Sequence, residues 1–503
     1  MSRLQLAIKN AKSVVVNDVI VMILQLITRY FFISKLGITL LGVNNLFVQI
    51  ISILAVSELG ISTAISYLLY KPLAQKDEKK IGGILQFYMT LYRYVAAIIF
   101  IIGIMLLPFL KYIVREYDNI EVIIIFLLFL VKACSSYLFS YKSILLEADQ
   151  KRSIISNIKL ISTFWGNIIQ VIVIIVFENY IFYLVLDIIF EWIRCILINI
   201  YVNKNYKYLS SKEFIEKKEK SIFLTKMKGL VINRLGNILV GQTDNIIISV
   251  GIDVTTVGLV SNYTMIISAL SMLCNNFLGA VTASFGNLFV EKNTQESLSV
   301  FNTYNLIGMM LASITSVYAF FLSKPFIALY IGEDYLMDLR IVLAMIINYY
   351  LVIARTPAYY AKVAYGILEV DWWVTMVEAF VNLAISIWGV HNIGLLGVYL
   401  GTLVSGLVNH FFTGYFLFKY GFKHGFSLYV ISILKNIMCT FFIFIICGLF
   451  ISMITLERQL FNMFLRFIIC SIVIIIVYVI FYARDSAAKK VLFIIKQKVQ
   501  RHI

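Results

Sequence analysis

The sequence predicts an all-α protein that crosses a membrane many times. Of its 503 residues, 61% are hydrophobic and 14% are charged, a composition too apolar for a soluble domain to bury. Apolar runs of about 20 residues recur along the whole length, and each is long enough for a helix to cross the roughly 30 Å hydrocarbon layer. The period-2 pattern of an outer-membrane barrel is absent from these runs.

About fourteen transmembrane helices are expected from the apolar runs and the polar loops between them. In chain order they cover residues 15–34, 43–70, 82–108, 122–146, 154–177, 181–203, 229–250, 256–290, 299–322, 339–364, 372–390, 395–418, 428–453 and 463–483. The first run is preceded by about a dozen polar or mixed residues and has full span length, so we expect it to remain as a helix rather than to be cleaved.

Basic residues indicate how the helices are oriented. Most of the 43 lysines and arginines fall in alternate loops and in the tail after residue 484, as is typical of segments that face the cytoplasm. The net charge of +16 therefore reports topology, and we expect no nucleic-acid partner. Both termini are predicted to be cytoplasmic.

The longest polar segment divides the predicted helices into two sets of six. We predict an N-terminal six-helix lobe (1–203), a cytoplasmic linker (204–228), a C-terminal six-helix lobe (229–418), and two additional helices with a basic cytoplasmic tail (419–503). The halves also open alike, because Gly42 through Asn45 matches Gly258 through Asn262, and Leu59 through Ala64 matches Leu278 through Ala283 at nearly the same offset. This pattern indicates a duplicated domain with parallel repeats that share a central site.

The sequence supports no enzyme chemistry. The six cysteines fall in predicted spans without metal or redox spacing, and the four histidines are scattered. The chain has no P-loop, no dinucleotide fingerprint and no nucleophile motif. We therefore expect neither a metal site nor a bound cofactor.

Polar side chains recur at helical spacing inside several spans. Asp18, Gln25 and Arg29 stand at i, i+7 and i+11, which places them within about 40° of one another on a helix. Arg234 and Asn245 repeat the outer spacing of this set in span seven. Because a charge at bilayer depth costs at least a few kcal/mol, we expect such faces to line a water-filled cavity between the two lobes.

The predicted cavity carries more positive than negative charge. Asp187, Glu191 and Arg194 are expected to neutralise one another locally at i, i+4 and i+7. The surplus cations that remain suit an anionic substrate, since a guanidinium group binds phosphate bidentately. The candidate substrate-binding residues are Arg29, Lys159, Arg234, Arg355, Gln25, Asn237, Gln242 and Asn245.

A gate between the lobes is the alternative use of the same charges. Asp18, Asp244 and Glu378 are the candidates for ion coupling or gating. As a gate, Arg29 would pair with Asp244, and Arg234 would pair with Asp18, across the lobe interface. The two arrangements are compatible with different stages of one cycle.

Several motifs together resemble a known family. They are Arg29 to Gly42, Glu58-Leu59-Gly60 through Ala64, Leu69-Tyr70, Pro72, Asp77, Thr243-Asp244-Asn245 through Ser249, and Gly394 through Gly401-Thr402. This set resembles the bacterial polysaccharide repeat-unit flippases of the Wzx type, which belong to the multidrug/oligosaccharidyl-lipid/polysaccharide (MOP) exporter superfamily. The resemblance covers most of the chain in length and span count.

The resemblance implies both an architecture and a function. The architecture is a V-shaped, MATE-like pair of six-helix lobes with two extra helices in the bacterial cytoplasmic membrane. The function is to carry undecaprenyl-pyrophosphate-linked repeat units of a capsule, O-antigen or exopolysaccharide from the inner to the outer leaflet. Alternating access would be driven by a proton or sodium gradient. We expect a monomer in the lipid bilayer, with a polysaccharide polymerase and chain-length machinery as further partners.

Two other transporters share this architecture. A lipid II flippase also carries an anionic lipid, whereas a MATE-type drug or cation antiporter would need a net acidic cavity, which the surplus cations disfavour. A membrane polymerase or ligase of glycans would normally carry its catalytic residues in a large outer loop, and the predicted outer loops are short.

The predicted topology is tested by labelling cysteines from outside intact cells. Lys218→Cys in the linker and Lys489→Cys in the tail should remain unmodified by a membrane-impermeant thiol reagent, because both segments are basic and are expected to face the cytoplasm. Modification of either residue before the cells are opened would overturn the orientation.

Overall fold

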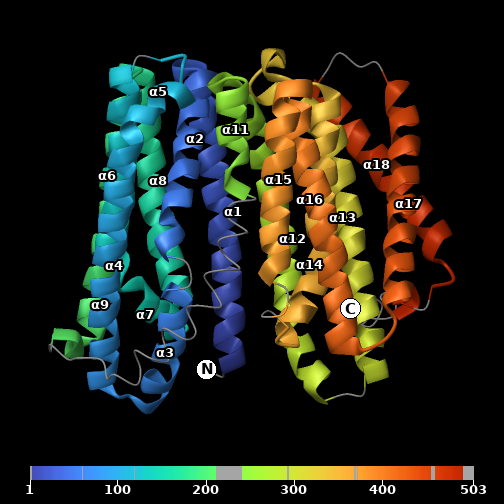
Figure 1. Ribbon diagram of the computed structural model, residues 1–503, viewed down its shortest axis with the longest axis horizontal. Helices are drawn as coiled ribbons and strands as arrows, with labels where there is room; N and C mark the ends of the chain where they lie inside the picture. Colours follow the sequence, from blue (N-terminus) through green and yellow to red (C-terminus); the bar gives the residue numbers. More distant parts are fainter. Residues whose placement is uncertain are drawn as a thin grey trace. The chain divides into compact units, whose positions relative to one another are not determined.

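The computed structural model has an all-α polytopic membrane fold, as the sequence predicts (Figure 1). It describes residues 3–58, 61–117, 119–210, 241–291, 294–367, 370, 372–454, 459–485 and 487–490. Within these ranges the regular secondary structure is helical, and 11 helices are long and apolar enough to cross a membrane. The chain divides into two compact units, Met1–Gly258 and Leu259–Ile503.

The first unit contains the helices that correspond to predicted spans one to six. They are α1 (Arg3–Leu36), α2 (Ile38–Leu54), α3 (Ile61–Gln75), α4 (Glu78–Leu106), α5 (Leu110–Ile113), α6 (Asn119–Ser140), α7 (Ser143–Ala148), α8 (Arg152–Phe177) and α9 (Tyr180–Asn205), with α11 (Asp244–Gly251) following later in the chain. At two of the helix starts a polar side chain caps the helix. Asp77 accepts a hydrogen bond from the Lys80 backbone N–H at the start of α4, and Asn179 accepts one from Phe182 at the start of α9.

The second unit contains most of α12 and all later helices. Their bounds are α12 (Val254–Glu291), α13 (Thr294–Tyr330), α14 (Leu339–Ala364), α15 (Trp372–Ile393), α16 (Leu395–Phe416), α17 (Phe426–Ser452) and α18 (Gln459–Tyr482). The α15–α16 hairpin is packed closely through small residues. A Cβ added at Gly397 would lie 2.2 Å from the Gly389 carbonyl carbon, so only glycine allows this approach.

Two predicted spans are interrupted. Span 43–70 is broken into α2, a 3₁₀ turn at Ala55–Glu58, and α3, and span 122–146 is broken into α6 and α7. At the second break the Ser143 hydroxyl donates to the Ser140 carbonyl over 2.7 Å, a local bond that competes with helix continuation. Predicted span 229–250 is described only from residue 241, and the predicted linker falls largely outside the described residues. The domain boundaries drawn from the sequence therefore stay predictions.

A buried polar network holds the two C-terminal helices on the second unit. Asn436 of α17 is fully buried, and its side-chain carbonyl accepts from Ser313 of α13 over 3.2 Å and from Tyr350 of α14 over 2.7 Å. Its amide group donates to Tyr478 of α18 over 3.1 Å. Hydrogen bonds among four helices in an apolar surrounding fix how these helices are placed against one another.

Equivalent positions of the two predicted repeats meet inside the first unit. The Thr39 and Thr255 hydroxyls are hydrogen-bonded over 3.0 Å. One turn further along, a Cβ at Gly42 would lie 1.9 Å from the Val254 carbonyl oxygen, and a Cβ at Gly258 would lie 2.2 Å from the Ile38 carbonyl oxygen. Helices α2 and α12 can lie this close only because each has a glycine at the contact, and no side chain would fit between their backbones.

Alanine at this contact should destabilise the protein. Gly42→Ala or Gly258→Ala is expected to lower the free energy of unfolding by about 1–3 kcal/mol, the usual cost of overpacking. Thermal unfolding of the purified protein in detergent measures the effect. Gly406→Ala is the matched control, since a Cβ there meets nothing within 4 Å. Equal melting of Gly42→Ala and the control would contradict the backbone contact.

Candidate functional site

The polar face predicted for span one meets span five, which contains Lys159, along the seam between α1 and α8. The Asn17 amide on α1 donates to the Ser156 hydroxyl over 3.1 Å and to the Asn157 side-chain oxygen over 2.7 Å on α8. Beside them, the Asp18 carboxylate lies 3.6 Å from the Lys159 ammonium. The seam therefore contains a hydrogen-bonded part and an ion pair.

The Asp18–Lys159 pair was not among the pairings predicted from the sequence. Lys159 was interpreted as a surplus cation, and Asp18 as a partner of Arg234. In the structure the Lys159 and Asp18 side chains are 43% and 25% exposed, so the pair is open to solvent and contributes at most about 1 kcal/mol to stability. An anion that binds Lys159 competes with Asp18 for it.

Helix α8 explains how such a face arises inside a membrane protein. Its buried side is made of small and polar residues, among them Ser162, Gly166 and Gln170. Its exposed side carries large apolar residues such as Phe164 and Trp165. This is the reverse of a soluble amphipathic helix, because the outer surface meets lipid and the polar groups must find partners inside.

The other predicted site residues of the first unit lie on α1 and in or just before α11. Gln25 is exposed on α1, and Arg29 is half-buried further along the same helix, within electrostatic range of Tyr183 on α9. In and just before α11, Gln242 and Asp244 are half-buried and Asn245 is buried. Arg234 and Asn237 lie outside the described residues.

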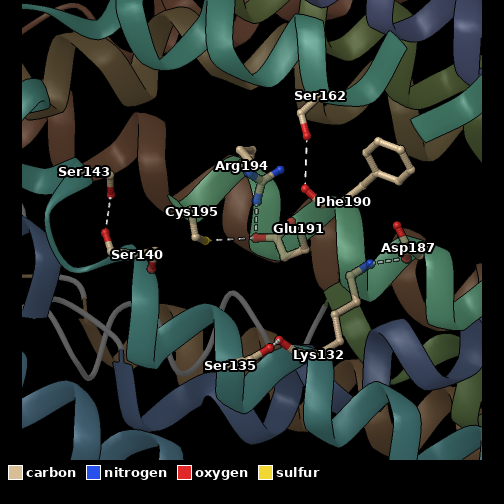
Figure 2. A network of polar contacts seen from close by, with 10 residues as sticks. All are labelled: Lys132, Ser135, Ser140, Ser143, Ser162, Asp187, Phe190, Glu191, Arg194 and Cys195. Atoms are coloured by element: carbon tan, nitrogen blue, oxygen red, sulfur yellow. Dashed lines mark hydrogen bonds and ion pairs between the residues drawn. The ribbon is translucent and has the colours of Figure 1, made fainter. Parts of the chain in front are cut away.

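A second charged cluster joins α6 and α9, and beside it the Ser162 hydroxyl of α8 donates to the Phe190 carbonyl of α9 over 3.0 Å (Figure 2). Lys132 of α6 forms an ion pair with Asp187 of α9, and Arg194 pairs with Glu191 one turn away on α9. The predicted mutual neutralisation of Asp187, Glu191 and Arg194 is therefore correct only for the last two. Packing of α6 against α9 supplies Asp187 with Lys132, a partner that spacing within a single helix cannot reveal.

In the second unit the structure brings together Arg355, predicted to bind substrate, and Glu378, predicted to couple ions or to gate. The Arg355 Nη1 lies 3.6 Å from the Glu378 Oε1, and these side chains are 20% and 6% exposed. Asn409 of α16 donates to the other oxygen of Glu378, and the Thr413 hydroxyl donates to Asn409 over 2.9 Å. The Glu378 carboxylate of α15 is thereby bound by side chains of two other helices, α14 and α16.

Sequence reasoning missed the α16 part of this cluster. The apolar helix is interrupted by three polar residues at i, i+1 and i+4, namely Asn409, His410 and Thr413. Polar residues at helical spacing are the same signal that indicated the polar faces of spans one and seven. The imidazole of His410 is buried and lies within electrostatic range of Arg355. Among the described residues, no group of three or more histidine, cysteine or acidic side chains is arranged to hold a metal ion.

Comparisons with known proteins identify the fold. No family model matches the sequence, and a search of curated proteins finds no significant relative. Among solved structures, a lipid II flippase, MurJ, in an inward closed conformation superposes with a TM-score of 0.69 and 14% identity, covering 93% of this chain and 98% of that chain. An inward-facing multidrug-resistance MATE transporter of the MOP superfamily superposes with a TM-score of 0.63 and 14% identity, covering 80% of this chain and 97% of that chain. A Vibrio cholerae MATE transporter superposes with a TM-score of 0.58 and 12% identity, covering 84% of this chain and 98% of that chain. At these identities the likeness establishes a shared fold, the one common to these flippase and transporter structures.

The Arg355–Glu378 pair should stabilise the second unit. Glu378→Gln leaves a largely buried guanidinium without its counter-charge, so we expect the free energy of unfolding to fall by about 3 kcal/mol. The double variant Arg355→Gln/Glu378→Gln should recover most of this loss. The control is Asp338→Asn in the exposed pair with Arg340, whose side chains are 41% and 81% exposed. There the expected effect is below about 1 kcal/mol. The free energy of unfolding of all three variants is measured in detergent micelles. Equal losses in Glu378→Gln and Asp338→Asn would show that the Arg355–Glu378 pair contributes no more than an exposed pair.

Proposed function

We propose that this protein is a flippase of the MOP superfamily. It would carry undecaprenyl-pyrophosphate-linked oligosaccharide repeat units of a capsule, O-antigen or exopolysaccharide from the inner to the outer leaflet of the bacterial cytoplasmic membrane. The observation that carries the proposal is the likeness to a structure named as a lipid II flippase, which extends over 93% of this chain. The fold is also that of MATE transporters, so the charged residues decide between substrates.

Charge favours a lipid-linked pyrophosphate over a cationic drug. In the proposed mechanism Arg29, Lys159 and Arg234 hold the pyrophosphate, with Arg355 as a further cation. The polar side chains that would contact sugar hydroxyls are Gln25, Asn237, Gln242 and Asn245. A cation exporter would need acidic groups in excess, and in the first unit Asp18 and Asp187 are each matched by a lysine.

The Asp18–Lys159 pair suggests how substrate and ion are coupled. When a phosphate binds Lys159, the Asp18 carboxylate loses its counter-charge, and a coupling cation can take the place of the Lys159 ammonium. Conversely, a coupling cation bound at Asp18 releases Lys159 for the phosphate. Each ligand thereby favours the other, as linkage between two sites requires. Asp244 and Glu378 are the other proposed coupling or gating carboxylates.

A lipid II flippase is the second candidate function, because one of the structures that superpose on this chain carries that description. Expression of this protein in cells depleted of their own lipid II flippase distinguishes the two: growth would assign peptidoglycan precursor as the substrate. A monomer with both termini in the cytoplasm, working beside a polysaccharide polymerase and chain-length machinery, completes the proposal.

Loss of any one of the proposed phosphate ligands should strongly reduce export. Each of Arg29→Ala, Lys159→Ala and Arg234→Ala removes a charge-assisted hydrogen bond, which costs about 1.5–3 kcal/mol of binding. Arg234→Lys keeps the charge but not the planar fork, so it should keep partial activity. The measurement is surface polysaccharide in a deletion strain, with expression checked by blotting.

A charge swap separates phosphate binding from pure gating. If Asp18 and Lys159 act only as a gate, the double variant Asp18→Lys/Lys159→Asp should export as the wild type does, because the ion pair is kept. If Lys159 binds the phosphate, the double variant should not export, because an aspartate then stands where the phosphate binds. The swap Asp18→Arg/Arg234→Asp tests the predicted gate pair in the same way. Wild-type surface polysaccharide from all three single alanine variants, at equal expression, would rule out the cationic site.

A further inference from the structure

The second unit contains a large apolar groove that the proposed transport mechanism does not use. It lies between α13, α14 and α16 on one side and α17 on the other, with a volume of about 1080 Å³. Its walls include Leu343, Ile347, Leu407, Phe441, Phe444 and Ile445. This volume exceeds the roughly 300–1,000 Å³ typical of pockets for small ligands, and the walls are suited to hydrocarbon.

One end of the groove is positively charged. Lys324 near the end of α13 and Arg466 near the start of α18 both line it, close to the residues that end α17. The Arg466 Nε donates to the Asn462 side-chain oxygen over 2.7 Å, and its Nη1 donates to the Phe321 carbonyl over 3.3 Å. These bonds fix the guanidinium group at the end of the groove. Within the described residues, neither cation forms an ion pair with a carboxylate.

Two cations at the end of an apolar groove need an anion that also carries hydrocarbon chains. A lipid phosphate provides the charge, and Arg466 and Lys324 provide charge-assisted donors to it. Basic pockets between transmembrane helices bind lipid head groups for the same reason. In the predicted topology α17 begins at the cytoplasmic side, so the charged end lies toward the outer leaflet.

We propose that this groove is a binding site for an anionic phospholipid of the outer leaflet. The phosphate is bound by Lys324 and Arg466, and the acyl chains lie along the apolar walls toward the middle of the membrane. The bound lipid fills the space between α17 and the rest of the unit, next to the Asn436 network that joins them. This site is separate from the residues proposed to bind pyrophosphate.

Gly448 offers a way to fill the groove without disturbing the protein. It lies in the lining, and a Cβ built on it meets nothing within 4 Å. Gly448→Phe therefore places a ring where the chains are expected to lie. Gly406 also has open space around its Cβ but is not part of the lining, so Gly406→Phe is the matched control.

The test is native mass spectrometry of the full-length protein in detergent with added phosphatidylglycerol or phosphatidylcholine. We expect the wild type to retain phosphatidylglycerol in preference to phosphatidylcholine. Lys324→Ala/Arg466→Ala should reduce bound phosphatidylglycerol about tenfold, because charge-assisted bonds to the phosphate are lost. Arg340→Ala removes a positive charge from an exposed pair outside the groove, and it should retain the lipid.

Each arm of the experiment can overturn the proposal. Equal retention of the two phospholipids by the wild type would show only non-specific lipid. Retention of phosphatidylglycerol by Gly448→Phe at the level of Gly406→Phe, with both variants folded by thermal unfolding, would place the lipid elsewhere. Displacement of phosphatidylglycerol from the wild type by equimolar undecaprenyl phosphate would assign the groove to a polyprenyl lipid instead.

Discussion

The absence of water from the hydrocarbon layer is the constraint on which the rest of this structure depends. Backbone groups are satisfied within helices, so the described chain is helical wherever it crosses the membrane. Ionisable side chains obey the same constraint by pairing between helices. Asp18 joins α1 to α8, Lys132 joins α6 to α9, and Glu378 joins α14, α15 and α16. Pairing thus offsets the cost of placing these charges in helices that cross the membrane.

The ion pairs differ in how easily they can exchange partners. In Asp18–Lys159 the paired atoms are 3.6 Å apart and both side chains are partly exposed, so the pair can open at small cost. The Arg355–Glu378 pair is more deeply buried, and Asn409 donates a hydrogen bond to its carboxylate. Breaking this pair leaves a buried charge with neither a counter-charge nor water around it, which is costly. In the proposed mechanism the first pair is therefore the one that exchanges partners with the substrate. The second pair would open in that mechanism only when another charge replaces the lost partner.

The sequence predicts the fold well because span length and polar spacing are local properties. Each predicted span within the described residues corresponds to a helix or to a pair of short helices, and the face with Asp18 does meet the face with Lys159. Partner identity is not local. Periodicity shows which face of a helix is polar but not which helix packs there, so Lys132 as the partner of Asp187 could not be predicted. The Asn436 network was missed for the same reason, since one asparagine in an apolar run does not indicate its four-helix surroundings.

The contact between α2 and α12 joins equivalent positions of the two predicted repeats. Thr39 meets Thr255 and Gly42 meets Gly258, and the two pairs have the same separation in sequence, 216 residues. A contact in which each position meets its own equivalent is self-complementary, as in a two-fold symmetric dimer. The close glycine approach therefore has the geometry of a two-fold symmetric contact, and a side chain at either glycine would separate α2 from α12.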